Sequence, residues 1–222
     1  MLRLLHDLGL SWQKTRPIHP EADPKAQARL KKFQALIGEV AHDHPDAERL
    51  EVWFQDEARV GQTGRLCRRW YHKGMRPRGL RDLRHQAVYL FGAVCPERDA
   101  GVALVLPSVS AAAMQAMLDE LSAAVAPGAH PVVLMDRAGW HIAKALAVPG
   151  NLTTLFPPPY SPELNAIEQV WLYLRERFLS HRLWSSYDAI LDACCAAWNG
   201  LLDEAGRIRS LCSLDWAMPV ST

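Results

Sequence analysis

The sequence predicts an α/β domain in which a mixed β-sheet is flanked by helices. Three observations support this fold class. The length of 222 residues suits one domain with a substantial core. Strand-like segments follow one another directly between residues 49 and 107, which favours antiparallel pairing. Strand-like and helical segments alternate after residue 110, which favours parallel pairing.

The strands are expected where apolar residues alternate with other residues or form short unbroken runs. In "RLEVWFQDEARV", Leu50, Val52 and Phe54 alternate with their neighbours, which predicts a strand that delivers Asp56 at its end. The apolar run "PVVLMD" predicts a buried parallel strand that ends at Asp136. The other expected strands are "RLCRRWYHKG" (65–74), "QAVYLFGAVCP" (86–96), "GVALVLP" (101–107) and "LTTLF" (152–156).

The helices are expected from apolar residues at helical spacing and from capping residues. Ser110 is a good N-cap for the alanine-rich segment that runs to Gly128. Prolines 157–159 end the last strand, and Ser161 as N-cap with Pro162 in the first turn predicts a helix through "ELNAIEQVWLYLRERFL". Further helices are expected at residues 1–11, 24–45, 141–148 and 186–202, and the tail after residue 207 is left without an element.

Composition excludes several classes of protein. No apolar run approaches the roughly 20 residues that span a membrane. The N-terminal segment is too short and too charged for a signal peptide. The five cysteines are odd in number and none has CxxC spacing, which argues against a disulfide framework and a structural zinc site. A reducing cytoplasm is the expected location.

Positive charge is concentrated in one segment of the chain. Between Arg59 and His85 there are nine Lys or Arg residues and one acid, so this segment carries about +8 and the remainder about −7. Such a segment is either a solvated basic loop or a surface that binds nucleic acid. Trp70 and Tyr71 within it are candidates for stacking on bases. The predicted DNA-binding residues are Arg65, Arg68, Arg69, Lys73, Arg76 and Arg78.

Three acidic residues are candidates for one chemical site. Asp56 and Asp136 are expected at the ends of strands, where ligand sites of α/β sheets lie. Glu168 lies on the helix expected after the prolines, beside its apolar stripe. Taken singly, Asp56 has the alternative of a solvated turn and Asp136 that of a helix cap. Glu168 has the alternative of an ion pair with Arg175 or Arg137.

Taken together, the three carboxylates have the chemistry of a divalent metal site. Hard cations such as Mg²⁺ prefer carboxylate oxygens. Two such ions can clamp the attacking and leaving oxygens of an in-line phosphoryl displacement. Without metal the three negative charges would repel one another, so the fold must hold them in place. We interpret the stiff proline segment as the device that fixes where Glu168 points.

The motifs that carry these acids resemble a known family. The stretches "VWFQDEARVG…RRWYHKGMRPRG", "VVLMDRAGWH" and "LFPPPYSPELNAIEQVWLYLR" are similar, in order and content, to transposases of insertion-sequence family 630. These enzymes are bacterial relatives of mariner elements. The resemblance implies a ribonuclease-H-like fold and a catalytic triad of Asp56, Asp136 and Glu168 that binds two Mg²⁺ or Mn²⁺ ions. It also implies cleavage of double-stranded DNA at transposon ends, followed by strand transfer to target DNA.

The chain departs from the family pattern near these acids. The 31 residues between Asp136 and Glu168 are fewer than is usual in the family. Arg137 stands where the family commonly has asparagine, so it either weakens metal binding or contacts phosphate. His141 matches a family position and either supports the site or caps the next helix. Supporting roles are assigned to Glu57, Arg137, His141 and Asn165.

We predict three regions along the chain. Residues 1–45 are expected to be the remnant of a DNA-recognition domain with a linker and a helix, because related enzymes carry helix-turn-helix domains in this position. Residues 46–205 are expected to form the ribonuclease-H-like catalytic domain, and residues 206–222 a C-terminal tail. The expected partners are DNA, a second copy of the chain on DNA, and a separate helix-turn-helix protein or frameshift product.

The leading hypothesis is a metal-dependent DNA transposase catalytic domain. The alternative is a truncated, non-catalytic DNA-binding remnant of a transposase. The short N-terminal region favours this alternative, whereas the intact set of three acids favours the enzyme. A glycosidase that uses two carboxylates would explain neither the basic segment nor the third acid.

Overall fold

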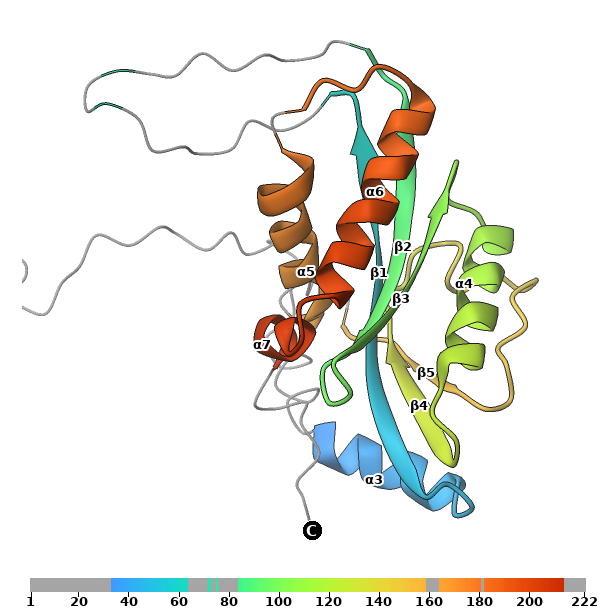
Figure 1. The fold of residues 1–222 in the computed structure, drawn as a ribbon. Helices are drawn as coiled ribbons and strands as arrows, with labels where there is room; N and C mark the ends of the chain where they lie inside the picture. Colours follow the sequence, from blue (N-terminus) through green and yellow to red (C-terminus); the bar gives the residue numbers. More distant parts are fainter. Residues whose placement is uncertain are drawn as a thin grey trace, which may run out of the picture.

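The computed structural model describes residues 33–63, 72, 75, 84–158, 164–180 and 182–213. Its centre is a five-stranded sheet with the strand order β3-β2-β1-β4-β5 (Figure 1). The strands are β1 (Arg49–Gly61), β2 (Ala87–Cys95), β3 (Ala100–Leu106), β4 (Ala129–Leu134) and β5 (Thr153–Leu155). β2 pairs antiparallel with β1 and β3, whereas β4 runs parallel to β1 and β5. The predicted mixed sheet is confirmed.

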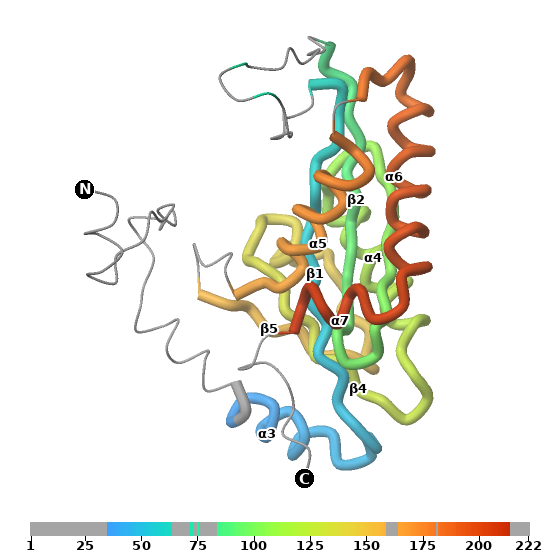
Figure 2. The backbone as a smooth tube through the Cα atoms, turned by 60° about the vertical axis from the view of Figure 1, so that its left-hand side comes forward, coloured from blue at the N-terminus to red at the C-terminus, as the bar shows by residue number. Residues whose placement is uncertain are grey.

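Helices cover both faces of the sheet. α4 packs against one face, and α5, α6 and α7 lie over the other, while α3 lies near the start of β1 (Figures 1 and 2). No helix in the described ranges is long and apolar enough to cross a membrane. The helices are α3 (Phe33–Asp43), α4 (Ala111–Ala124), α5 (Ile167–Leu174), the π-helical turn η2 (Arg175–Leu179), α6 (Tyr187–Leu202) and α7 (Arg207–Cys212).

The side chains of β1 divide the core between the two faces. Phe54 packs into the apolar cluster under α5, α6 and α7, and Trp53 packs into the cluster under α4. Both side chains are buried. Successive side chains of a strand point to opposite faces. Asp56 therefore lies on the α5 side with Phe54, and Glu57 lies on the α4 side with Trp53.

Several predicted elements and caps are confirmed. The Ser110 side chain accepts a hydrogen bond from the backbone N–H of Ala113 and caps α4 as expected. The expected helices within 24–45 and 186–202 are present as α3 and α6. The expected apolar stripe of α5 is buried, namely Ile167, Val170, Trp171 and Leu174.

β1 differs from its prediction because it does not end at Asp56. It continues to Gly61, since its second half pairs antiparallel with β2 as far as the Gly61–Ala87 position. The parallel pairing with β4 does stop just before Asp56, at the Phe54–Leu134 position. Asp56 therefore lies inside a long strand, immediately after the end of its parallel partner.

Three other predictions are wrong or incomplete. The segment 141–148 forms turns instead of a helix. α5 begins at Ile167, not near Pro162, and the described residues before it are held by Asn165, which bonds to β1. The tail, left without an element, contains α7, whose Ile208 and Cys212 are buried in the core.

Several predicted features lie outside the described residues. They include the expected N-terminal helix and linker, the expected strand at 65–74 apart from His72, and the aromatic residues Trp70 and Tyr71. The expected helix start at Ser161 and Pro162 and the end of the tail from residue 214 also lie outside them.

Candidate functional site

The pairing of β1 with β4 brings the first two predicted acids to the same level of the sheet. The register runs from Arg49 opposite Ala129 to Phe54 opposite Leu134. Continuing this register by two residues sets Asp136 opposite Asp56. Neighbouring strands lie about 4.8 Å apart. Because β4 ends at Leu134, Asp136 lies in the loop that immediately follows it.

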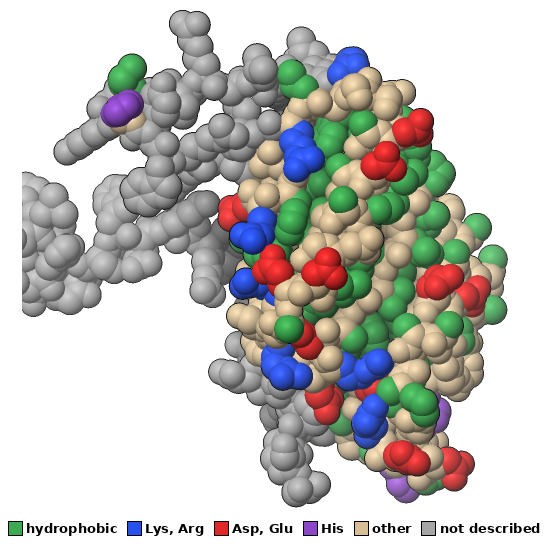
Figure 3. Space-filling model, viewed as in Figure 1, with side chains coloured by type: hydrophobic (Ala, Val, Ile, Leu, Met, Phe, Trp, Pro, Cys, Tyr) green, Lys and Arg blue, Asp and Glu red, His purple; other side chains and the backbone are tan. Residues whose placement is uncertain are grey.

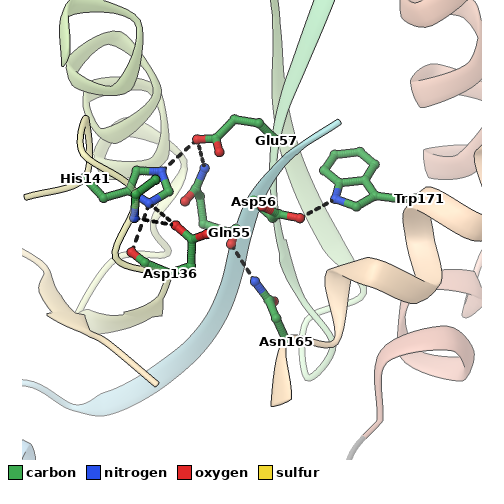
Figure 4. Close-up of polar contacts among 8 residues, drawn as sticks. Gln55, Asp56, Glu57, Asp136, His141, Asn165 and Trp171 are labelled. Atoms are coloured by element: carbon green, nitrogen blue, oxygen red, sulfur yellow. Dashed lines mark hydrogen bonds and ion pairs between the residues drawn. The ribbon is translucent and has the colours of Figure 1, made fainter. Parts of the chain in front are cut away.

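Asp56 points toward α5 (Figure 4). Its Oδ2 accepts a hydrogen bond of 3.0 Å from the indole Nε1 of Trp171. The pKa of Asp56 is raised to about 7, chiefly by burial and further by the negative charges of Glu57 and Glu168, while its hydrogen bonds act in the opposite direction. Asp56 is thus a partly buried carboxyl group near other carboxylates, with an indole donor on one oxygen.

Glu168 lies in the first turn of α5, one turn before Trp171. Its side chain is exposed, although partial burial raises its pKa while Arg175 opposes that effect. Its charge also raises the pKa of Asp56, so the two acids lie within electrostatic reach of each other. Glu168 and Arg175 do not form the ion pair considered as an alternative, because no contact between them lies within ion-pair distance in the described residues. Arg175 only lowers the pKa of Glu168 through its charge.

Asp136 lies on the other side of the β1 ribbon from Asp56 and faces His141 (Figure 4). Its Oδ1 is 2.6 Å from Nδ1 of His141 and accepts a 2.9 Å hydrogen bond from the backbone N–H of Ala138. The hydrogen bond with His141 holds the pKa of Asp136 below its ordinary value. The Asp136 side chain is 61% exposed, so solvent and ligands can reach it.

His141 is a buried imidazole held between two carboxylates. Its Nε2 is 2.8 Å from Oε1 of Glu57, while its Nδ1 faces Asp136. Burial alone would lower the pKa of His141, but the hydrogen bonds to Asp136 and Glu57 and their negative charges raise it to about 9. At neutral pH His141 is therefore an imidazolium that donates from both ring nitrogens. It does not cap a helix, since the segment that follows it forms turns.

Gln55 and Asn165 connect β1 to both halves of the site. Asn165 Nδ2 donates a 2.7 Å hydrogen bond to the backbone oxygen of Gln55, which anchors the chain just before α5. Gln55 Nε2 donates a 3.0 Å hydrogen bond to Oε1 of Glu57. The backbone of Gln55 therefore holds the segment before α5, the helix that carries Glu168. The side chain of Gln55 holds Glu57, which binds His141.

A cavity of about 310 Å³ lies between the second half of β1 and α5. It shares Trp171 with Asp56 and continues along the same face of β1, past Ala58 and Val60. Arg59 and Arg175 line it, and the charge of Arg175 lowers the pKa of Glu168. This arrangement suits a ligand that carries negative charge.

The structure brings the three predicted acids to one region but not to one point. Asp56 and Glu168 interact on the α5 side, and Asp136 is bound to His141 on the α4 side. Among the described residues, no three His, Cys, Asp or Glu side chains lie close enough together to hold a metal ion. The shared position of Asp56 and Asp136 comes from the strand register, whereas their side chains have separate partners.

The remaining predicted site residues fall into two groups. Arg137 is exposed and lies over the ring of Phe156, 5.8 Å from its centre. On the face seen in Figure 3, Lys and Arg are interspersed with Asp and Glu over the described residues. The predicted DNA-binding residues all lie outside the described residues: Arg65, Arg68, Arg69, Lys73, Arg76 and Arg78.

Two site residues were missed by the sequence reasoning. Trp171 was expected only as a core residue, yet its indole N–H binds Asp56. Gln55 was not singled out, yet it binds both Glu57 and the Asn165 side chain. A signal for Trp171 was available, because it lies three residues after Glu168 and therefore on the same side of the helix. The strand alternation also placed Gln55 and Glu57 on one face.

The fold is a five-stranded mixed sheet flanked by helices, with Asp56 and Asp136 each two residues beyond the last β1–β4 pair. The family model described as "DDE superfamily endonuclease" matches residues 51–191, and the chain belongs to this family. A second family model, "Winged helix-turn helix", matches residues 1–33. That match covers part of the region predicted to derive from a DNA-recognition domain.

Two relatives extend the comparison. An uncharacterized protein, y4pE/y4sA, of Sinorhizobium fredii is 48% identical over 129 residues, which cover 58% of this chain and 96% of the relative. The insertion element IS630 uncharacterized 39 kDa protein of Shigella sonnei is 21% identical over 188 residues, covering 83% of this chain. The chain spans about half of that relative's length, 53%. The resemblance to transposases of insertion-sequence family 630 is confirmed.

Solved structures of the Mos1 mariner transposase share the fold. The Mos1 paired end complex with Mn matches with a TM-score of 0.60 and 17% identity, over 96% of this chain and 70% of that chain. The complex with Mg also gives 0.60, at 14% identity, over 92% of this chain and 63% of that chain. The predicted ribonuclease-H-like fold is confirmed, and the chain is an IS630/mariner-type transposase homologue.

Proposed function

We propose that this protein cleaves phosphodiester bonds at the ends of a transposon and joins the freed ends to target DNA, using Asp56, Asp136 and Glu168. The observation that supports the proposal is the strand register, in which the β1–β4 pairing ends two residues before both Asp56 and Asp136, together with the charge of Glu168 that acts on Asp56. Membership of the DDE superfamily endonucleases supports the reaction class.

The donor set fits divalent metal ions in its chemistry. Asp56, Asp136 and Glu168 would supply the carboxylate oxygens that Mg²⁺ and Mn²⁺ prefer. The raised pKa of Asp56 supports this fit, because it reflects a partly buried carboxyl group near the negative charges of Glu57 and Glu168. When bound, such ions supply positive charge to the phosphoryl oxygens and make water more acidic. We propose two ions, as in the general two-metal arrangement.

The other residues of the site position these carboxylates and the substrate. Trp171 donates to one oxygen of Asp56, which orients the other oxygen. Asn165 anchors the chain before α5 and so fixes the level of Glu168 along β1. Arg59 and Arg175 in the neighbouring cavity would neutralise charge on the DNA backbone.

DNA would be held mainly by the basic segment and by the N-terminal region. Arg65, Arg68, Arg69, Lys73, Arg76 and Arg78 would contact phosphates, because a cluster of cations releases counterions from DNA. The winged helix-turn-helix match at residues 1–33 supports a contribution to sequence recognition. We propose that the protein acts as a homodimer on DNA, with a separate helix-turn-helix protein or frameshift product as a further partner.

The test is cleavage of an end-labelled duplex that contains the ends of the element. The purified chain is incubated with Mg²⁺ or Mn²⁺ and compared with Asp56→Asn, Asp136→Asn and Glu168→Gln. We expect nicking by the wild type and a loss of at least about 100-fold in each variant. Glu176→Gln is the matched control, since Glu176 is an exposed acid in η2, eight positions after Glu168. Equal nicking by wild type and the three acid variants would overturn the proposal.

A further inference from the structure

We infer that Glu57 is a positioning residue, which fixes the carboxylate of Asp136 by binding the opposite edge of the His141 ring. This inference rests on the proposed function. It assigns to the second acid of the Asp56–Glu57 pair a role distinct from that of the first. Glu57 itself need touch neither DNA nor metal ion, because it acts through the histidine.

Two adjacent acids of β1 contact different parts of the site. Asp56 and Glu57 are adjacent, so their side chains point to opposite faces of the sheet. Asp56 meets Trp171 on the α5 side, and Glu57 meets His141 on the α4 side (Figure 4). The same strand segment therefore carries one candidate metal ligand, Asp56, and binds His141 in the loop that carries a second one, Asp136.

Asp136 lies beyond the end of the strand pairing. β4 ends at Leu134, so the sheet no longer fixes the backbone where Asp136 lies. What fixes the Asp136 carboxylate within the described residues is a pair of contacts to Oδ1, from Nδ1 of His141 at 2.6 Å and from the backbone N–H of Ala138 at 2.9 Å. The His141 Nδ1 also lies 2.9 Å from the backbone oxygen of Asp136. These contacts leave Oδ2 available as a ligand atom.

Glu57 fixes the ring of His141. The imidazole is planar and rigid, and both of its nitrogens face carboxylate oxygens, so each nitrogen carries a hydrogen. The Glu57 side chain is only 8% exposed, and Gln55 holds the same Oε1 by a 3.0 Å hydrogen bond. A carboxylate fixed in this way sets the direction of the ring, and the ring sets Oδ1 of Asp136. Hydrogen-bond partners of metal ligands typically change metal affinity by about 10–100-fold when removed.

The test compares Glu57→Ala with Glu57→Gln, which keeps an oxygen that can accept from His141. Tyr173→Phe is the matched control, because it removes a similarly short hydrogen bond, that from Tyr173 Oη in α5 to Glu204 after α6 at 2.6 Å. The first measurement is Mn²⁺ affinity of the full chain by calorimetric titration. We expect Glu57→Ala to bind Mn²⁺ about 10–100-fold more weakly. We expect Glu57→Gln to recover most of that loss and Tyr173→Phe to match the wild type.

The second measurement needs no metal. Hydrogen exchange of the Ala138 amide reports directly on its bond to Asp136. We expect this amide to exchange at least about 10-fold faster in Glu57→Ala, with Glu57→Gln close to the wild type. A buried ion pair that only stabilised the fold would speed exchange across the core as well, and core amides serve as the internal reference.

The outcomes separate the inference from the proposed function. If Glu57→Ala is folded and keeps both wild-type Mn²⁺ affinity and wild-type exchange at Ala138, the positioning role is wrong. If Mn²⁺ does not bind the wild type, or binds Asp136→Ala equally well, the proposed metal site fails. The exchange at Ala138 still decides in that case whether Glu57 positions Asp136.

Discussion

Replacing Gly92 by alanine should disturb the site from the opposite strand. Gly92 of β2 is the partner of Asp56 in the antiparallel register. A Cβ at this position would lie 2.6 Å from Cη2 of Trp171 and 3.1 Å from Cη2 of Trp198. The glycine therefore provides the space in which the Trp171 ring lies while its indole N–H binds Asp56.

The size of the effect follows from this overlap. Carbon atoms in contact lie roughly 3.5–4.0 Å apart, so the Trp171 ring must move by about 1 Å. The ring has little freedom to do so, because the side chain is 4% exposed and packs against Trp198. Overpacking of this kind costs about 1–3 kcal/mol, and we expect the upper end of that range. For a domain of this size, 3 kcal/mol corresponds to a fall in Tm of roughly 6–12 °C.

Thermal unfolding followed by tryptophan fluorescence measures this effect. Gly38→Ala is the matched control, because nothing lies within 4 Å of a Cβ added at Gly38 in α3. It should raise stability by about 0.5–1 kcal/mol, since alanine is the better residue inside a helix. A second variant, Trp171→Phe, shortens the ring, so Gly92→Ala should cost less in that background than in the wild type. A Tm for Gly92→Ala equal to that of the wild type would refute the packing argument.

Two other predictions concern stability. Arg98→Ala should destabilise the fold by about 3 kcal/mol in urea unfolding, because Glu51 is fully buried and would lose the guanidinium 3.1 Å from its Oε2. Arg49→Ala should cost less than about 1 kcal/mol, since Arg49 is 53% exposed, and equal losses would contradict this reasoning. Burial and the stacked neighbouring histidine lower the pKa of His130 from its ordinary 6.5, so the folded state binds fewer protons than the unfolded chain. The contribution of His130 to stability is full above about pH 6.5 and falls as the pH drops toward the pKa of the folded state. If His130→Gln loses Tm below about pH 6.5 as steeply as the wild type does, His130 is not the cause of this pH dependence.

The sequence was informative where a local pattern and the tertiary structure agree. The alternation from Leu50 to Phe54 predicted a strand, and Ser110 predicted the start of α4. The unbroken apolar run before Asp136 predicted a buried parallel strand, and β4 does pair parallel with β1 up to two residues before Asp56 and Asp136. These features depend on residues within a few positions of one another.

The parts that could not be predicted depend on contacts between distant segments. β1 extends past Asp56 because β2, some 30 residues later, pairs with it, and no residue after Asp56 signals this. The segment after His141 has helical spacing, but its histidine is drawn to Glu57, 84 positions earlier in the chain. The bond from Trp171 to Asp56 depends in the same way on packing between α5 and the sheet.

The packing of α7 has a consequence for where this protein can be shortened. Asp99, in the turn between β2 and β3, accepts hydrogen bonds from the backbone N–H groups of Gly206 and Arg209 and so fastens α7 to the sheet. At the other end of α7, the Cys212 thiol points to the backbone oxygen of Ala166, directly before α5. A fragment that stopped at residue 205 would uncover apolar core and release the support beneath the first turn of the helix that carries Glu168. A shortened protein should therefore retain the chain through residue 213, because α7 supports both the core and the segment directly before α5.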